Sequence, residues 1–248
     1  HTKFIEETPS LFDVKESKDR ATKVLRYIGK KYITARREMG FLVPSKGYEY
    51  ATIKGHKCAI IVGDDLSRER DFDQSVETVI SINARKYGKG TMTYRYEMMR
   101  NLAFVESKNL VLVNQVGGST EIVYDGTSGA LNSRGELVLM MKNFEEDFQI
   151  FDTKASARPI TIPSTYNDRT RLVYEAARCG LRDFFRKNGY RKASIGLSGG
   201  IDSAVVASIA ADALGAENVR ALLMPSPFSS HESVEDAKEL ARNLGIEY

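Results

Sequence analysis

Short apolar runs with turn residues between them fill most of the chain from Lys23 to Asp152. Continuous apolar runs of this length favour strands that are buried on both faces of a sheet. The runs that we predict to be strands are residues 58–63, 77–83, 110–118 and 121–126. Residues 128–141 predict a hairpin with its turn at Asn132–Gly135.

One segment in this half has helical spacing. Apolar side chains in residues 94–109 recur at intervals of three and four positions, which predicts a helix. The face that we expect to be buried carries Tyr94, Met98, Leu102 and Val105.

The pattern changes after residues 153–170, where Pro159 and Pro163 stand among several Ser, Thr and Asn residues. Such a composition indicates a linker, which we place at residues 153–163, between a first domain at 1–152 and a second at 164–248. The second domain opens with a predicted helix that Asp168 caps and Gly189 ends.

Two strand–helix pairs follow this first helix. The segments KASIGL and NVRALLMP predict strands. The helix after the first strand ends at Gly215, and the helix after the second is opened by Ser229 and Glu232 in a capping-box spacing. Strands that alternate with helices predict an α/β fold with a parallel sheet.

The loop GLSGGIDS, residues 196–203, joins the first of these strands to its helix. A helix N-terminus offers unpaired N–H groups and a positive dipole end, which attract phosphate. Gly199 and Gly200 let the backbone approach an anion, and Ser198 and Ser203 can donate hydroxyl hydrogen bonds. Asp202 faces phosphate favourably only through a cation, which predicts Mg²⁺. The alternative is a tight turn with an N-cap and no ligand.

The string matches neither common nucleotide-binding fingerprint, because no Gly-Lys-Ser/Thr follows and no Gly-x-Gly-x-x-Gly is present. SGGIDS resembles the pyrophosphate loop of the N-type ATP pyrophosphatases. Residues 164–248 as a whole resemble the start of the synthetase domain of glutamine-dependent NAD⁺ synthetases, which has an adenine nucleotide alpha hydrolase-like fold.

This resemblance implies roles for particular residues. The residues implied to bind ATP are Gly196, Leu197, Ser198, Gly199, Gly200, Ile201, Asp202, Ser203 and Met224. Asp202 would also hold Mg²⁺, and Met224 would lie at the nucleotide-facing end of the second strand. Many relatives have Arg where this chain has Pro227.

Residues 23–152 resemble the later part of a nitrilase-type glutaminase domain, which is the C-terminal half of an α-β-β-α fold. Such amidases use a Glu, a Lys and a Cys. Relatives have a Cys-Glu-Asp string where this chain has Gly63-Asp64-Asp65. Glycine offers no nucleophile, so we expect that glutamine hydrolysis is lost. Lys30 falls at the family lysine position, with an exposed lysine as the alternative.

Residues 83–86 and Cys58 also favour a loss of glutamine hydrolysis. Relatives have Ser-Ala-Ser-Pro where this chain has Asn83-Ala84-Arg85-Lys86, which adds two positive charges near the glutamine pocket. Cys58 lies inside a predicted strand, and we expect it to be a buried core residue. His56 has no partner at metal-ligand spacing, so we expect no metal role for it.

Composition narrows the remaining choices. The net charge of +3 is too small to indicate nucleic acid or a membrane as a partner. Cys58 and Cys179 lie in apolar segments, which favours reduced thiols and the cytoplasm. We expect no transmembrane helix and no signal peptide, because no suitable apolar run is found. The ends, His1 and Tyr248, lead us to expect a piece of a longer protein.

The first hypothesis is an ATP-dependent ligase that joins ammonia to nicotinic acid adenine dinucleotide, giving NAD⁺, AMP and pyrophosphate. Its ammonia source, glutamine or solution, stays open, and the resemblance implies a homo-oligomer. The alternatives are another N-type ATP pyrophosphatase, such as a tRNA-modifying enzyme, an amidase, which the missing cysteine opposes, and a non-catalytic fragment or assembly domain. We expect little turnover from these 248 residues alone, because two strands are too few to enclose both ATP and a dinucleotide.

Overall fold

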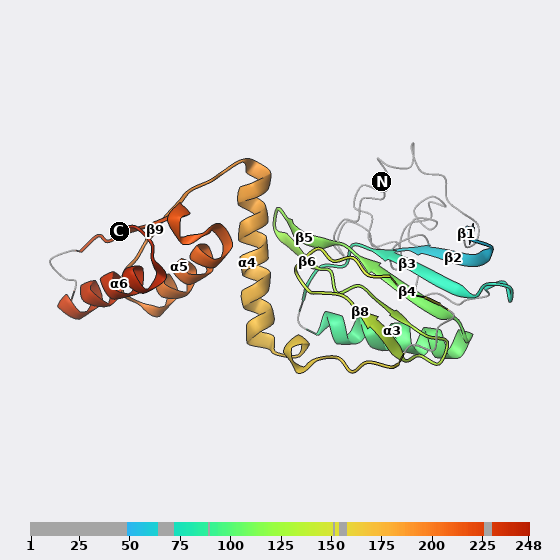
Figure 1. Ribbon diagram of the computed structural model, residues 1–248. Helices are drawn as coiled ribbons and strands as arrows, with labels where there is room; N and C mark the ends of the chain where they lie inside the picture. Colours follow the sequence, from blue (N-terminus) through green and yellow to red (C-terminus); the bar gives the residue numbers. More distant parts are fainter. Residues whose placement is uncertain (1–48, 64–71, 89, 151, 154–157, 226–229) are drawn as a thin grey trace, which may run out of the picture. The chain divides into compact units, whose positions relative to one another are not determined.

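The computed structural model describes residues 49–248 except 64–71, 89, 151, 154–157 and 226–229 (Figure 1). They divide into two compact units: one holds the residues up to Val116 together with Asp125–Ile162, the other Gly117–Tyr124 with Pro163–Tyr248. The sequence boundary at 153–163 had put Gly117–Tyr124 in the first domain. Element labels follow Figure 1.

The first unit is built on a six-stranded sheet of order β1-β2-β3-β4-β7-β8. Its strands are β1 Glu49–Ile53, β2 His56–Val62, β3 Thr78–Asn83, β4 Asn109–Asn114, β7 Gly129–Leu131 and β8 Leu137–Met140. β2, β3 and β4 run parallel, whereas β1, β7 and β8 are antiparallel to their neighbours. The sheet is therefore mixed, and the expected hairpin is present as β7 and β8, closed by a bond from Gly135 N to Asn132 O.

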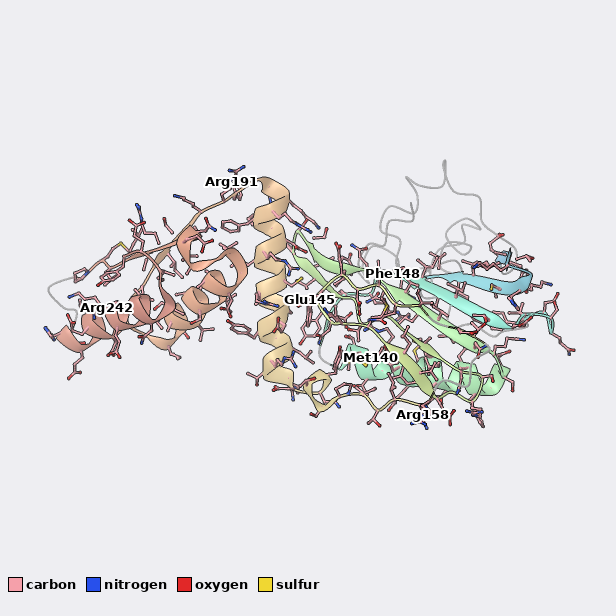
Figure 2. All side chains as sticks on the ribbon, in the orientation of Figure 1. Met140, Glu145, Phe148, Arg158, Arg191 and Arg242 are labelled. Atoms are coloured by element: carbon pink, nitrogen blue, oxygen red, sulfur yellow. The ribbon has the colours of Figure 1, made fainter. Side chains whose placement is uncertain are left out.

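The two faces of this sheet differ in burial. One face carries the fully buried Ala59, Val79, Leu110 and Leu112, in register across β2, β3 and β4. On the other face Ile82 and Val113 are 43% and 47% exposed. Phe148, on the segment after β8, is exposed as well (Figure 2). Within the described residues, the three parallel strands are thus buried on one face only. Their apolar sequences predict burial on both faces.

Helix α3, Thr91–Glu106, begins three residues before the predicted 94–109 and packs against β4 and β7, with a face that matches the predicted one only in part, at Leu102. Tyr94 and Val105 are exposed, and the buried residues are Met92, Arg95, Tyr96, Met99, Leu102 and Ala103. The prediction counted only apolar side chains. Arg95 and Tyr96 bury their long side chains because each finds a polar partner at its tip.

The second unit contains most of a two-stranded sheet of β5 Val116–Ser119 and β6 Ile122–Asp125. The strand predicted at 110–118 is thus divided into β4 and β5, whereas β6 matches the strand predicted at 121–126. After the 3-10 turn Ser164–Tyr166 come α4 Arg169–Asn188, β9 Ala193–Gly196, α5 Ile201–Leu214, the 3-10 turn Ala216–Asn218, β10 Val219–Leu222 and α6 His231–Leu244. β9 and β10 are parallel, so the predicted strand–helix order and the α/β class are confirmed.

The helix caps follow the sequence at α4 and differ at α6. The Asp168 carboxylate accepts a bond from Arg171 N, and Gly189 ends α4 at a φ of 73°. Helix α6 is capped by Ser230, whose Oγ accepts from Ser233 N at 3.2 Å, and not by Ser229 as predicted. Arg242, in its last turn, donates to the Tyr248 hydroxyl.

Small residues form the core of the second unit. The buried cluster consists of Leu197, Ala207, Ala210, Ala211, Val219, Ala221, Ala237, Ala241 and Ile246. The alanines let α5 and α6 approach the two strands closely. Helix α5 is apolar on its outer side too, since Ile201, Val205 and Val206 are exposed. None of the described helices combines the length and apolar character of a membrane span.

Candidate nucleotide site and the glutaminase-type edge

The loop expected to bind phosphate begins where β9 ends. Leu197 N bonds to Leu222 O at 3.0 Å, so the ladder between β9 and β10 continues one residue past Gly196. The Leu197 side chain is 3% exposed and anchors the loop in the core. Ser198 is the first residue that leaves the sheet, and α5 starts at Ile201. The loop therefore lies at the carboxyl end of a parallel strand, where open α/β sheets bind ligands.

The two loop serines form hydrogen bonds within the loop. Ser203 Oγ donates to Gly200 O at 2.9 Å and accepts from Ser198 N at 3.2 Å. The Ser198 and Ser203 hydroxyls lie 3.0 Å apart, and Gly200 N donates to Ser198 Oγ at 3.3 Å. We expected these hydroxyls to face a phosphate. In this structure they shape the loop, which leaves the first main-chain N–H groups of α5 as the donors for an anion.

The two glycines of the loop have different roles. Gly199 has a φ of 82°, and a Cβ there would lie 2.7 Å from the Ser233 carbonyl carbon in α6. Gly199 is therefore required by its backbone conformation and by its packing. Gly200 has an ordinary φ of −87° and caps α5, and a Cβ there would meet only Ser198 Oγ at 3.5 Å. The space beside Gly200 is therefore open, and a bound group could occupy it.

The contact between the loop and α6 escaped the sequence reasoning. The Ser230 cap bonds the main-chain N–H of Ser233, and the carbonyl of Ser233 faces Gly199. The spacing of Ser230 and Ser233 was the available signal. This spacing indicates only that a helix begins there. It does not indicate that the first turn of the helix contacts residues 198–200.

The predicted metal ligand is an exposed acid beside the loop. Asp202 lies in the first turn of α5, and its residue is exposed. Among the described residues no three His, Cys, Asp or Glu side chains gather to hold a metal ion by themselves. A single carboxylate beside a polyphosphate site fits Mg²⁺, which takes few protein ligands and completes its shell with phosphate and water.

Met224 lies where the resemblance placed it, just beyond the carboxyl end of β10. Its side chain is exposed, and its Cε would be 3.4 Å from a Cβ on Gly196. Gly196 and Met224 thus sit together on neighbouring strands, so the structure brings every predicted ATP-binding residue to one edge of the sheet.

The glutaminase-type residues lie at the carboxyl ends of β2, β3 and β4. The register pairs Val62 with Ile82 and Asn83 with Asn114, so Gly63 follows β2 at the level of these two asparagines. Gly63 is buried and has a φ of 72°. The position expected for a nucleophile therefore has no side chain and a left-handed backbone. Lys30 and Pro227 lie outside the described residues.

Cys58 does not substitute for the missing nucleophile. It is 5% exposed within β2, and burial, with the nearby Glu77 carboxylate, raises the pKa of its thiol. The reactive thiolate is therefore disfavoured at neutral pH. His56 pairs with Glu77 at 3.1 Å, which gives this histidine a partner but no metal-binding set.

A buried polar network next to this edge was not predicted. Arg95 makes two bonds to Asp125, of 3.1 and 2.8 Å, and both side chains are almost wholly buried. Asn114 Nδ2 donates to Asp125 Oδ1 and to Gly126 O, each at 2.9 Å. Asn114 precedes β5 and Asp125 ends β6, so their bond joins the two ends of the Val116–Asp125 hairpin.

Comparison with known proteins agrees with these features. Residues 173–248 match the model of the NAD synthase family. This part of the chain therefore has the sequence pattern of an NAD synthase domain. The match contains the loop, α5, β10 and α6, the elements that form the candidate nucleotide site.

Curated relatives extend this likeness upstream. The chain is 36% identical over 216 residues to the glutamine-dependent NAD(+) synthetase of Synechocystis, which covers 80% of this chain and 39% of that protein. It is 35% identical over 234 residues to the enzyme of Aquifex aeolicus, with 79% and 41% covered. The chain spans about two fifths of the length of these NAD synthase relatives.

Solved structures show the same likeness. Glutamine-dependent NAD+ synthetase from Acinetobacter baumannii, in complex with ADP, aligns with a TM-score of 0.71 and 31% identity over 85% of this chain and 41% of that one. The enzyme from Cytophaga hutchinsonii aligns at 0.63 with 18% identity, which shows the shared fold.

Proposed function

We propose that this chain contains the phosphate-binding part of an ATP-dependent ligase that converts nicotinic acid adenine dinucleotide to NAD⁺. The observation that carries the proposal is the 198–203 loop, which presents the N-terminus of α5 at the carboxyl edge of β9 and β10. The family match over residues 173–248 and the ADP-bound relative support the choice of an adenine nucleotide.

The reaction has two steps. A carboxylate oxygen of the dinucleotide attacks the α-phosphorus of ATP, and the bond to pyrophosphate breaks. Ammonia then attacks the acyl carbon of the adenylate, loses a proton, and AMP leaves with the carboxylate oxygen.

The residues of this chain act in the first step. The N–H groups that open α5 would hold the pyrophosphate oxygens as the α–β bond breaks. Asp202 would hold Mg²⁺, which supplies charge neutralisation to the polyphosphate. Leu197 and Gly199 keep the loop fixed, through the core and through the α6 contact.

Residues 1–152 are, in this proposal, part of a nitrilase-like glutaminase domain without glutaminase activity, residues 153–163 the linker, and residues 164–248 the start of the synthetase domain. The absence of a side chain at Gly63 and the neutral, buried thiol of Cys58 support the loss of glutamine hydrolysis. Ammonia would then come from solution or from another protein.

Assembly and compartment belong to the same proposal. The resemblance to glutamine-dependent NAD⁺ synthetases implies that the whole protein forms a homo-oligomer, which we include in the proposal. Cys58 and Cys179 are both free and buried, which suits the reducing cytoplasm.

Thermal unfolding with and without nucleotide tests the ATP site. We expect ATP with Mg²⁺ to raise the Tm of the chain, adenosine with Mg²⁺ to leave it unchanged, and Asp202→Ala to remove the increase. Asp236→Ala, an exposed acid of α6, is the matched control and should respond like the unaltered chain. A Tm that saturating ATP and Mg²⁺ leave unchanged would refute nucleotide binding by these residues.

A further inference from the structure

Gly118 in β5 gives both of its main-chain polar groups to side chains of α4, and Figure 1 shows this hairpin beside the helix. Its N–H donates to Asp183 Oδ2 at 2.7 Å, and its carbonyl accepts from Lys187 Nζ. Asp183 and Lys187 are one helical turn apart, so they lie on the same face of α4. Two side chains of one helix therefore bind both polar main-chain groups of a single hairpin residue.

Glycines on both elements permit this close approach. A Cβ on Gly117, whose φ is 108°, would lie 2.6 Å from Asp183 Oδ2. A Cβ on Gly118 would lie 3.0 Å from the Cα of Gly180, and a Cβ on Gly180 would lie 3.1 Å from Val123 Cγ2. Side chains at these positions would push the hairpin off the helix, so the sequence is fitted to the contact on both partners.

The charge of Asp183 is balanced where it is buried. The residue is 1% exposed, and its Oδ1 lies 3.2 Å from Arg182 Nε and 3.4 Å from an Arg186 nitrogen. Oδ2 is thereby left for Gly118, with the Cys179 thiol 4.0 Å away. A buried carboxylate is stable only with such partners, so loss of the Gly118 bond would leave an acceptor without one of them.

Other residues of α4 connect it to the phosphate loop. Leu181 packs on the core cluster that contains Leu197, the residue just before the loop. The Tyr174 hydroxyl donates to Asp212 of α5, the helix that opens at Gly200. Helix α4 therefore contacts the hairpin through Gly180, Asp183 and Lys187, and α5 and the core through Tyr174 and Leu181.

We propose that Asp183 is a positioning residue that clamps the Gly117–Tyr124 hairpin on α4 and so holds α4 and α5 where the 198–203 loop binds ATP. Lys187 forms the second arm of the clamp. The inference rests on the proposed ATP site, and it adds a requirement: a segment that precedes the linker in sequence is part of the nucleotide-binding unit.

Two measurements on the full chain test this clamp. Hydrogen–deuterium exchange of residues 115–124 reports the hairpin contact, and titration with ATP and Mg²⁺ reports nucleotide affinity. The variants are Asp183→Ala, which removes the acceptor, Asp183→Asn, which retains an acceptor oxygen, and Lys187→Met, which keeps the stem of an exposed residue. Asp236→Ala is the control.

We expect Asp183→Ala to speed exchange of the Gly118 amide about tenfold or more and to weaken ATP binding about fivefold or more. Lys187→Met should change both in the same direction by less. Asp183→Asn keeps an acceptor for Gly118 N–H but turns an NH2 group toward Arg182 and Arg186, so its affinity should fall between those of Asp183→Ala and the unaltered chain. Because Lys187 is exposed, its variant retains the fold even if Asp183→Ala does not.

The outcomes separate the two proposals. No ATP response in the unaltered chain refutes the ATP site, and with it the positioning role. An ATP response in the unaltered chain that Asp183→Ala and Lys187→Met both retain in full, despite faster Gly118 exchange, overturns the positioning role alone. Unchanged Gly118 exchange in both variants overturns the clamp itself.

Discussion

The main-chain carbonyl of Ser233 occupies the space where a side chain on Gly199 would begin. The phosphate loop and the first turn of α6 are therefore packed backbone to backbone, with no room for a methyl group. The shape of the loop is set by this contact together with the hydrogen bonds between its own serines.

Gly199→Ala should consequently destabilise the second unit by about 2–4 kcal/mol, which combines the cost of a left-handed alanine with that of overpacking. Gly200→Ala is the matched control, since its φ is ordinary and its Cβ would meet nothing closer than 3.5 Å. It should cost about 1 kcal/mol or less, as a less favoured N-cap. Urea unfolding followed by circular dichroism measures both; equal losses would contradict this account of Gly199.

Of the ion pairs described in the first unit, the Arg95–Asp125 pair should contribute most to the free energy of unfolding. Arg95→Met leaves the Asp125 carboxylate buried without its main partner, which costs about 3–5 kcal/mol. Arg134→Ala breaks the Glu136 pair, whose arginine is 71% exposed, and should cost less than about 1 kcal/mol. Chemical denaturation of the two variants gives the comparison, and a small effect of Arg95→Met would show that the pair is dispensable.

Incubation with glutamine should release no glutamate above the blank. Gly63 has no nucleophilic atom, and burial keeps the Cys58 thiol protonated by raising its pKa. Cys58→Ala is the matched control and should give the same background in an enzyme-coupled glutamate assay. Glutamate release that this substitution abolishes would show that Cys58 is reactive after all.

The hairpin contact should weaken only in acid. Burial by itself raises the pKa of Asp183, but the bond from Gly118 N–H and the charges of Arg182 and Arg186 outweigh burial, so the pKa is lowered from 3.8. A carboxyl whose pKa is lower in the folded state adds stability above its unfolded pKa and loses it as the pH falls through the folded pKa. The contribution of Asp183 is therefore complete above about pH 4 and declines below 3.8.

Titration of the Asp183 carboxyl carbon by NMR measures this directly, alongside Gly118 exchange at each pH. Burial raises the pKa of the neighbouring Cys179 thiol, so the thiol does not titrate in this acidic range. A midpoint at or above 3.8 would contradict the assigned contacts.

Local sequence signals predicted the elements of the second unit well. Asp168 and Gly189 mark α4, and Gly215 marks the end of α5, because capping chemistry acts within a few residues. The loop could be found for the same reason, since its glycines and serines stand between a strand and a helix.

Contacts between distant residues could not be predicted in this way. No local signal shows that Arg95 pairs with Asp125, which lies thirty positions later in the chain. Counting apolar residues therefore gave α3 a buried face that is right at Leu102 and wrong at Tyr94 and Val105. Gly117 and Gly118 were expected to end a strand at 110–118, and the reason for glycine there is seen only beside Gly180 and Asp183 of α4. The split of residues 110–118 at Gln115 likewise depends on Asn83 O, which accepts from Gln115 N at 2.9 Å.

The hairpin also bears on how this protein can be divided. A fragment that starts at Pro163 would expose the Gly180 face of α4 to water and deprive the Asp183 carboxylate of its Gly118 partner. A fragment that ends before the linker would hold a hairpin with no helix to rest on. A segment of the second unit lies between two segments of the first along the chain. Cleavage at any single site therefore leaves at least one of the two units incomplete.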